Sequence, residues 1–206
     1  MSTQPNPAPI TARANTEQRF LDAAERLLVD VGYAAITTRK LADEAGANLG
    51  LVHYYFGSME EVFLQVLERF TDQLIARQRA MYASPAPYIE KWREAMRYLD
   101  EDRPYQKIWF ELQAMAWNRP DFKGRIARVL DAWREAMRGA VAEALARYKL
   151  SGDGFSTEAW VTMIVTLNEG VILERLSGID RGHTELLAAI GRWLDSKERN
   201  AGNASP

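Results

Sequence analysis

The sequence predicts an all-α fold of about nine helices. Three observations lead to this prediction. Apolar residues recur at spacings of three and four along most of the chain, which is the period of a helix with one buried face. Capping residues begin many of these segments, and glycine or proline ends them. We find no alternating strand pattern, no internal repeat, and no low-complexity block outside the termini.

The N-terminal segment, residues 1–14, carries alternating prolines among polar residues, which predicts a disordered arm. The first helix follows, with Asn15 or Thr16 as its N-cap and Gly32 as its stop. The apolar face of this helix consists of Phe20, Ala23, Ala24, Leu27, Leu28 and Val31.

Two short helices are expected on either side of Gly46. The first of them begins at Thr37 or Thr38, and Gly46 closes it through a left-handed cap. Asn48 is a natural N-cap for the next one, which ends near Tyr55. The sequence therefore places two short helices, joined by a tight turn, after a longer one.

The run Ser58-Met59-Glu60-Glu61 is a capping box, and it predicts the start of a fourth, longer helix. This helix ends before the two prolines in the segment 84–87. Further helical patterns cover about 88–100, 104–117, 121–149, 156–177 and 180–198.

The composition excludes several classes of protein. With 206 residues, of which 47% are hydrophobic, the chain can bury a sizeable core. No run approaches the ~18 apolar residues of a membrane helix, and the N-terminus lacks the apolar core of a signal peptide, so we expect a cytoplasmic protein. The absence of cysteine and the presence of two histidines predict no metal site, no cofactor and no catalytic residue. The sequence identifies no partner for His183.

The formal net charge of −2 does not favour a nucleic-acid-binding protein, so any DNA contact must depend on local geometry and a few cations. The two short helices around Gly46 nevertheless form a helix-turn-helix, an arrangement whose second helix lies in the major groove of DNA.

Over residues 16–63 the sequence resembles the TetR family of bacterial transcriptional regulators. The matching segments are VDVGYAAIT, TTRKLADEAGA and NLGLVHYYFGSMEEVF. The remainder matches the family only in the number and length of its helices. We therefore expect a DNA-binding domain at 15–60, a helical ligand-binding and dimerisation domain at 61–198, and a flexible tail at 199–206.

The resemblance also implies which residues contact DNA. Thr37 and Thr38 would contact phosphate, Arg39 would reach a base edge, and residues 48–51 would face the groove floor. The histidine and the last tyrosine would bind phosphates or sugars, whereas Tyr54 either joins them or packs inward. Many relatives carry lysine where this chain has Met59, so the helix N-terminus there remains the attraction for phosphate. The set is Thr37, Thr38, Arg39, Asn48, Leu49, Gly50, Leu51, His53, Tyr54 and Tyr55.

Aromatic and methionine side chains gather on the middle helices, where helix bundles build cavities. Each of them is also compatible with ordinary core packing. Because few polar groups accompany them, we expect a small, predominantly apolar effector. The predicted lining is Trp92, Met96, Trp109, Phe110, Gln113, Trp117, Trp133 and Met137.

The last two helices carry more apolar surface than two terminal helices can bury alone. Paired across a two-fold axis, they would form a four-helix interface between two copies of the chain. The predicted interface is Trp160, Met163, Ile164, Leu167, Val171, Leu187, Ile190, Trp193 and Leu194.

These expectations combine into a homodimeric, ligand-responsive transcriptional repressor that binds a palindromic operator and is released by its effector. One recognition helix reads few bases, so two copies must lie about 34–36 Å apart or a small multiple of that distance. Two alternatives stay open. One is an all-α enzyme with an aromatic cavity, although Glu111, Gln113, Asn168 and Glu169 form no catalytic set by spacing. The other is a DNA-binding regulator without a small ligand.

Overall fold

The computed structural model describes residues 10–150 and 154–203. This part of the chain forms nine α-helices and one short 3-10 helix, so the all-α prediction is confirmed. None of these helices combines the length and the apolar composition needed to span a bilayer. The elements are α1 (Ile10–Val31), the 3-10 turn η1 (Tyr33–Ala35), α2 (Thr38–Ala45), α3 (Gly50–Phe56), α4 (Met59–Ala83), α5 (Tyr88–Glu101), α6 (Arg103–Ala116), α7 (Pro120–Arg147), α8 (Thr157–Leu176) and α9 (His183–Asn203).

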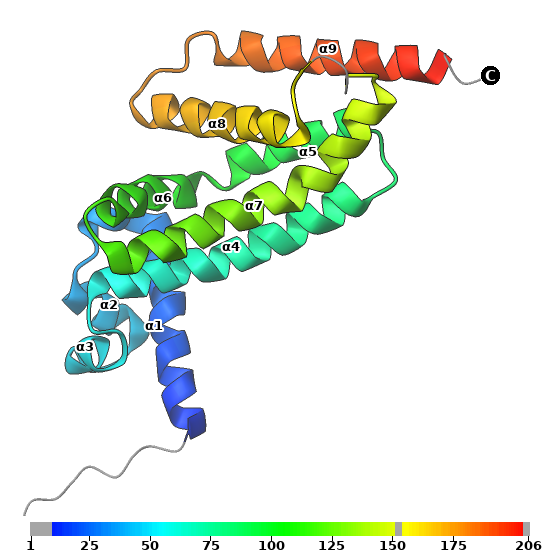
Figure 1. The fold of residues 1–206 in the computed structure, drawn as a ribbon. Coiled ribbons are helices and arrows are strands. Elements are labelled where there is room, and N and C mark those ends of the chain that lie inside the picture. Colours follow the sequence, from blue (N-terminus) through cyan, green and yellow to red (C-terminus); the bar gives the residue numbers. More distant parts are fainter. Residues whose placement is uncertain (1–9, 151–153, 204–206) are drawn as a thin grey trace, which may run out of the picture.

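The helices are arranged around two long neighbours, α4 and α7, which run side by side through the middle of the molecule (Figure 1). Helices α1, α2 and α3 lie at one end, and α8 and α9 lie at the opposite end. Helix α8 packs chiefly on α7, whereas α9 packs chiefly on α5. The last two helices are therefore held by different neighbours rather than by each other.

The caps predicted around the short helices are present. The Thr37 hydroxyl accepts a hydrogen bond from the Lys40 amide at 3.2 Å and begins α2. Gly46 ends that helix in the left-handed conformation, with φ 59° and ψ 41°. The Asn48 side chain accepts from the Gly50 amide at 2.9 Å. Each cap satisfies a backbone group that a short helix would otherwise leave unpaired.

The predicted capping box at the start of α4 is only half formed. The Ser58 hydroxyl accepts from the Glu61 amide at 3.2 Å, as expected. The Glu61 carboxylate does not turn back to the cap, because it binds Arg125 of α7 at 2.7 Å. Arg125 also pairs with Glu68 at 2.5 Å, so this arginine fastens α7 to α4.

The predicted ends of the first and last helices are wrong. Helix α1 begins at Ile10, so 10–14 are helical, Asn15 and Thr16 lie inside the helix, and 1–9 fall outside the described residues. Helical pairs four residues apart, such as Arg13 with Glu17 at 3.1 Å, support this extra turn.

Helix α9 runs from His183 to Asn203, beyond the expected end at 198, and 204–206 lie outside the described part. Ala201 packs against the core cluster between α5, α7, α8 and α9, which explains why the helix continues. The buried His183 ring donates a hydrogen bond from Nε2 to the Glu174 carboxylate of α8, 2.6 Å away. This contact supplies the partner that the sequence did not identify.

Two hydrophobic clusters fill the interior. The larger one joins α1, α2, α3, α4, α6 and α7, and its members Phe20, Phe63 and Ile108 are at most 1% exposed. The smaller one joins α5, α7, α8 and α9. Because α4 contributes along most of its N-terminal half to the first cluster, the proposed DNA-binding helices share a core with the helices that follow.

Candidate nucleic-acid interface and cavities

The turn between α2 and α3 is held by a residue of α1 that the sequence analysis did not single out. Arg19 donates hydrogen bonds to the backbone oxygens of Ala45 and Gly46, the latter at 2.7 Å. A Cβ atom at Gly46 would lie 2.9 Å from the Arg19 guanidinium and would also oppose the positive φ. The positive φ is the main reason that glycine is favoured at this turn, since the guanidinium is the end of a flexible side chain.

Most of the predicted DNA contacts lie on one exposed surface, formed by the start of α2 and by α3. Within the described part of the chain no carboxylate pairs with Arg39, so its guanidinium is available to an outside partner. Leu49 is 45% exposed although it is apolar, as expected for a side chain that meets a partner. The exposed members of the set are Thr37, Arg39, Asn48, Leu49, Gly50, His53 and Tyr54.

The hydrogen bonds at this surface decide which atoms remain for a ligand. The Thr37 oxygen accepts the cap bond, so its hydroxyl hydrogen is still free to donate to a phosphate. His53 Nδ1 lies 3.1 Å from the Gly57 carbonyl oxygen, which can only accept. Nδ1 therefore carries the proton, and Nε2 accepts from a donor unless the ring is protonated on both nitrogens.

The environments of Tyr54 and Tyr55 are the reverse of those that the sequence favoured. Tyr54 is 69% exposed, so the alternative in which it packs inward is wrong. Tyr55 is half-buried and packs against the core, with its ring centroid 6.5 Å from that of Phe20. Thr38 at the start of α2 and Leu51 in α3 are half-buried as well, and Leu51 packs on the core.

One cation beside α3 was missed because it falls in the segment expected to be disordered. The Arg13 guanidinium lies 5.9 Å and 5.7 Å from the ring centroids of Tyr54 and Tyr55. Met59, which replaces a lysine of many relatives, is half-buried against the core. Its side chain is therefore used for packing at the first residue of α4.

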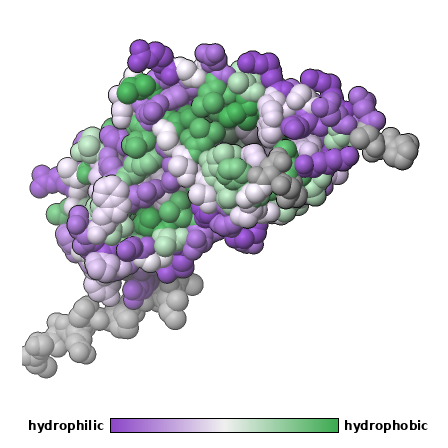
Figure 2. All heavy atoms as spheres, turned by 45° about the horizontal axis from the view of Figure 1, so that its top comes forward, coloured by the Kyte–Doolittle hydropathy of each residue, from purple (hydrophilic) through white to green (hydrophobic). Residues whose placement is uncertain are grey.

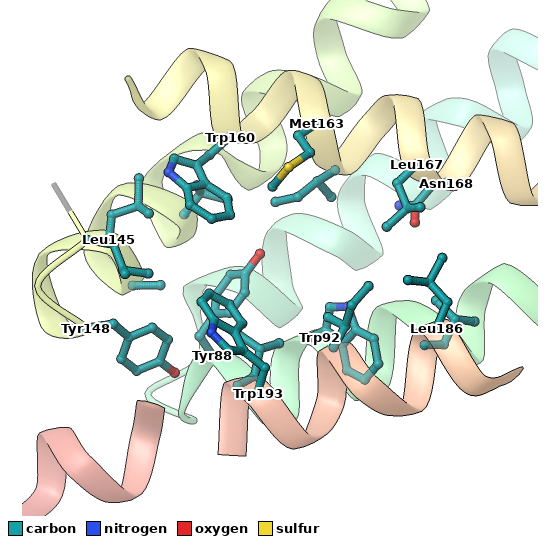
Figure 3. Close-up of a pocket in the computed structure, with 17 residues that line it drawn as sticks. Tyr88, Trp92, Leu145, Tyr148, Trp160, Met163, Leu167, Asn168, Leu186 and Trp193 are labelled. Atoms are coloured by element: carbon teal, nitrogen blue, oxygen red, sulfur yellow. The ribbon is translucent and has the colours of Figure 1, made fainter. Parts of the chain in front are cut away.

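A cavity of about 430 Å³ lies between α8 and α9, with α5 and α7 beneath it. We call it the outer cavity (Figure 3). Its lining is Tyr88, Trp92, Val141, Ala144, Leu145, Tyr148, Leu150, Trp160, Met163, Ile164, Leu167, Asn168, Leu186, Leu187, Ile190, Trp193 and Leu194. Figure 2 shows hydrophobic surface around a hollow on the face turned toward the viewer, where the end with α8 and α9 comes forward.

A smaller cavity of about 110 Å³, the central cavity, is enclosed by α4, α5, α6, α7 and α8. It contains three of the predicted lining residues, Trp109, Trp133 and Met137. Its wall holds a polar group, because the Glu169 carboxylate accepts from Trp109 Nε1 at 3.3 Å and from Gln113 Nε2 at 3.1 Å.

The remaining lining predictions need correction. Trp92 lines the outer cavity instead, because α5 carries it beneath α9. Trp117 is 79% exposed, since α6 ends just before it and its side chain projects from the helix end. Met96, Phe110 and Gln113 line neither cavity; Phe110, for example, packs against the larger core cluster.

The predicted dimer residues are mostly directed inward. All of them except Val171 line the outer cavity, and Val171 is 4% exposed within the subunit. They face inward because α8 and α9 turn these sides toward α7 and α5. Other apolar side chains of this end, such as Leu173 and Ile179, are about half exposed, at 50% and 49%.

A ring pair connects the central cavity to α1. Phe70 and Tyr105 both line the cavity, and their rings stack with centroids 3.6 Å apart. The Tyr105 hydroxyl donates to the Glu25 carboxylate at 2.5 Å, and burial, followed by this contact, raises the pKa of Tyr105. Arg69 of α4 binds the same glutamate. The cavity wall is thereby attached to the helix that braces the α2–α3 turn.

Residues 20–66 match the model of the family described as "Bacterial regulatory proteins, tetR family". The HTH-type transcriptional regulator YfiR of Bacillus subtilis is 24% identical over 125 residues, which are 58% of this chain and 60% of that protein. The HTH-type transcriptional repressor KstR2 of Rhodococcus jostii is 33% identical over 81 residues, 39% of this chain and 40% of its own length. The chain thus aligns with 60% or less of the length of these relatives.

The fold has solved counterparts. The crystal structure of the transcriptional regulator FadR from Bacillus subtilis in complex with stearoyl-CoA superposes with a TM-score of 0.64 at 17% identity. It covers 86% of this chain and 96% of that one, so the likeness extends through the C-terminal helices and shows a shared fold. These proteins are transcriptional regulators rather than enzymes, which removes support from the enzyme alternative.

Proposed function

The chain belongs to the tetR family of bacterial regulatory proteins, and from this premise we propose that it is a homodimeric transcriptional repressor. It binds a palindromic operator and is released by a small, predominantly apolar effector held among its C-terminal helices. The observation that carries the proposal is the exposed surface of α2 and α3 on a turn that Arg19 holds in place.

The geometry of this surface favours DNA over other partners. A short helix with exposed Asn48, Leu49 and Gly50 at its start offers a narrow tip to the major groove, and Gly50 adds no side-chain bulk. Arg39 and the Thr37 hydroxyl flank this tip and suit a base edge and a phosphate, respectively. The chain is not basic overall, so specific contacts rather than net charge must supply much of the affinity.

A second copy of the chain is needed because one recognition helix reads too few bases to select a site. The exposed side of α8 and α9 favours such pairing. A shallow groove there contains Met163, Thr166 and Gly170, and exposed Leu173 and Leu176 continue it. Small residues at its centre let two helices approach closely across a two-fold axis.

Release by an effector requires that the effector bind the two shapes of the dimer with different affinity. The contacts of α8 support such a link. Glu169 of α8 binds Trp109 and Gln113 of α6, and Tyr105 of α6 binds Glu25 of α1. A displacement of α8 would therefore act on the helix that holds the recognition surface. The fold shared with FadR, whose structure contains stearoyl-CoA, supports the binding of an effector by this chain.

The direct test is selection of bound duplexes from a random library, followed by footprinting. We expect an enriched palindrome whose half-sites lie about 34–36 Å apart or a small multiple of that distance. The matched control is Arg39→Ala, which removes one base contact and leaves the fold intact. Enrichment of no sequence, or of a site without two-fold symmetry, would contradict the proposal.

The dimer has its own test. Thr166→Arg places a charge in the centre of the groove on an exposed residue with no role in the subunit core. We expect sedimentation to show a folded monomer, because an unpaired charge is costly to bury at an interface. Thr184→Arg, at another exposed threonine on the first turn of α9, is the control. An unaltered dimer of the Thr166 variant would place the interface elsewhere.

A further inference from the structure

The outer cavity differs from the central one in the chemistry of its walls. Its lining contains leucine, isoleucine, valine, methionine and five aromatic rings, and no charged side chain is found among its described residues. The central cavity, in contrast, includes the carboxylates of Asp102 and Glu169. The outer cavity is also about four times as large, at about 430 Å³ against about 110 Å³.

Besides the indole nitrogens and the Tyr148 hydroxyl, which donates to Glu198 at 2.8 Å, two polar groups interrupt this apolar lining. Figure 3 shows the Tyr88 hydroxyl directed into the space between α8 and α9, with the Asn168 carboxamide at the other end of the same space. Neither group has a hydrogen-bond partner in the described part of the chain. Burial raises the pKa of Tyr88, so this hydroxyl keeps its proton and can donate.

We propose that the outer cavity binds an uncharged, elongated lipophilic molecule with one hydroxyl or carbonyl oxygen, which hydrogen-bonds to Tyr88 or Asn168. This inference rests on the proposed function and names the class of its effector. It also moves the effector from the central cavity, where the sequence placed it, to the space between α8 and α9.

Electrostatics selects the uncharged class. A carboxylate or an ammonium group in this cavity would lose its water and find no opposite charge, which is far more costly than burying an apolar chain. A pure hydrocarbon would fill the space but leave Tyr88 and Asn168 unpaired. A single oxygen on a long apolar body satisfies both conditions.

The position of the cavity also suits a regulatory ligand. Its rim includes Trp193, which is 39% exposed and does not line the proposed dimer groove, so a ligand can enter from the surface. Asn168 belongs to the walls of both cavities, and the next residue, Glu169, binds α6. A ligand against Asn168 is thus one residue away from the contacts that lead to α1.

The test compares probes of equal chain length by calorimetry on the full-length protein: decanol, decanoate, decyltrimethylammonium and decane. We expect decanol to bind, and the two charged probes to bind at least roughly 30-fold more weakly, because each must bury an unpaired charge. Decane should bind more weakly than decanol by roughly three- to tenfold, the worth of one hydrogen bond.

Matched substitutions locate the site. Ala144→Phe fills the outer cavity and should abolish decanol binding, whereas Ala95→Phe fills the central cavity and should leave it unchanged. Tyr88→Phe removes one oxygen and keeps the shape, so decanol affinity should fall by roughly three- to tenfold while decane affinity stays constant. This last variant tests the site even if the larger side chain at 144 disturbs folding.

Besides an absence of decanol binding, two results would overturn the inference. One is tight binding of decanoate or of decyltrimethylammonium, which would require a charged partner that the lining lacks. The other is decanol binding that Ala144→Phe and Tyr88→Phe leave intact. Operator binding is measured separately on the same samples, so a protein that selects a palindrome but binds no decanol disproves this inference alone. A protein that selects no DNA disproves the proposed function.

Discussion

Amphipathic helices form both ends of the molecule, but they enclose a filled core at one end and leave a cavity at the other. At the α1–α3 end, the short helices α2 and α3 pack with α1 around a core in which Phe20 and Val52 are completely buried, and the exposed surface is largely polar. At the α8–α9 end, longer helices leave a cavity of about 430 Å³ and expose large apolar side chains such as Leu173 and Ile179. Amphipathic helices therefore do not by themselves ensure a filled interior.

The difference arises from how the helices are held. Each short helix has a cap at its start, and Arg19 binds the turn between them, so few arrangements remain possible. Helices α8 and α9 each follow a different neighbour and are joined to one another by few contacts, such as His183 with Glu174. Long helices held in this way separate along part of their length, and the space between them suits a ligand.

The largest expected effect is a loss of stability at the α1–α3 end, which we call the closed end because its core is filled. Phe20→Ala should lower the free energy of unfolding by about 3–5 kcal/mol, because it opens a void in a filled core. Ile164→Ala, which enlarges a cavity that already exists, should cost only about 1–2 kcal/mol. Urea denaturation of both variants measures the two values. Equal losses would mean that the outer cavity is filled in solution.

The next effect concerns recognition by the closed end. Arg39→Ala should weaken binding to the selected operator by about 1–3 kcal/mol and binding to a scrambled duplex much less, if the guanidinium reads a base. Fluorescence anisotropy with both duplexes measures the ratio. Equal losses on the two duplexes would assign Arg39 to a phosphate instead.

A smaller effect is expected at the first residue of α4. Met59→Lys adds a cation whose stem can keep the apolar packing while the amine reaches the surface. The logarithmic salt dependence of operator binding should steepen by about 0.9 for each subunit, with little change in sequence preference. Titration at several salt concentrations gives the slope, and an unchanged slope would show that this position does not face the DNA backbone.

The smallest effect tests how α9 is held. Arg147, by its hydrogen bond, and to a lesser degree Tyr148 keep the pKa of Glu198 below its usual value. Since this pair is partly exposed to solvent, Glu198→Gln should lower Tm at pH 7 by only about 1–2 °C.

The pH dependence of that difference follows from the sign of the shift. A carboxyl whose pKa is lower in the folded state stabilises above its unfolded pKa and loses that contribution as the pH falls. The gap between parent and variant should therefore shrink from about pH 4 downward. A gap that persists in acid would indicate that the glutamine disturbs packing rather than charge.

The closed end could be predicted in detail because its determinants are local. Thr37, Gly46, Asn48 and Ser58 act on backbone groups within four residues of themselves, so their roles are visible in the sequence. Arg19 could not be found in this way, because its acceptors are 26 and 27 residues away. Tyr54 and Tyr55 were assigned in reverse, since a helix as short as α3 contains too few turns to define an apolar face.

At the α8–α9 end, which contains the outer cavity, the sequence alone determined the helices but not the spaces between them. The helical period and the large number of apolar residues on α8 and α9 were both readable in the sequence. Only the tertiary structure decided whether Trp160 and Ile164 face a partner or a cavity. The sequence shows that a helix has an apolar face, but it does not show which other elements pack against that face. The physical reason is that burial of apolar surface is non-directional, whereas caps and turns depend on hydrogen bonds between particular donor and acceptor atoms with a defined geometry.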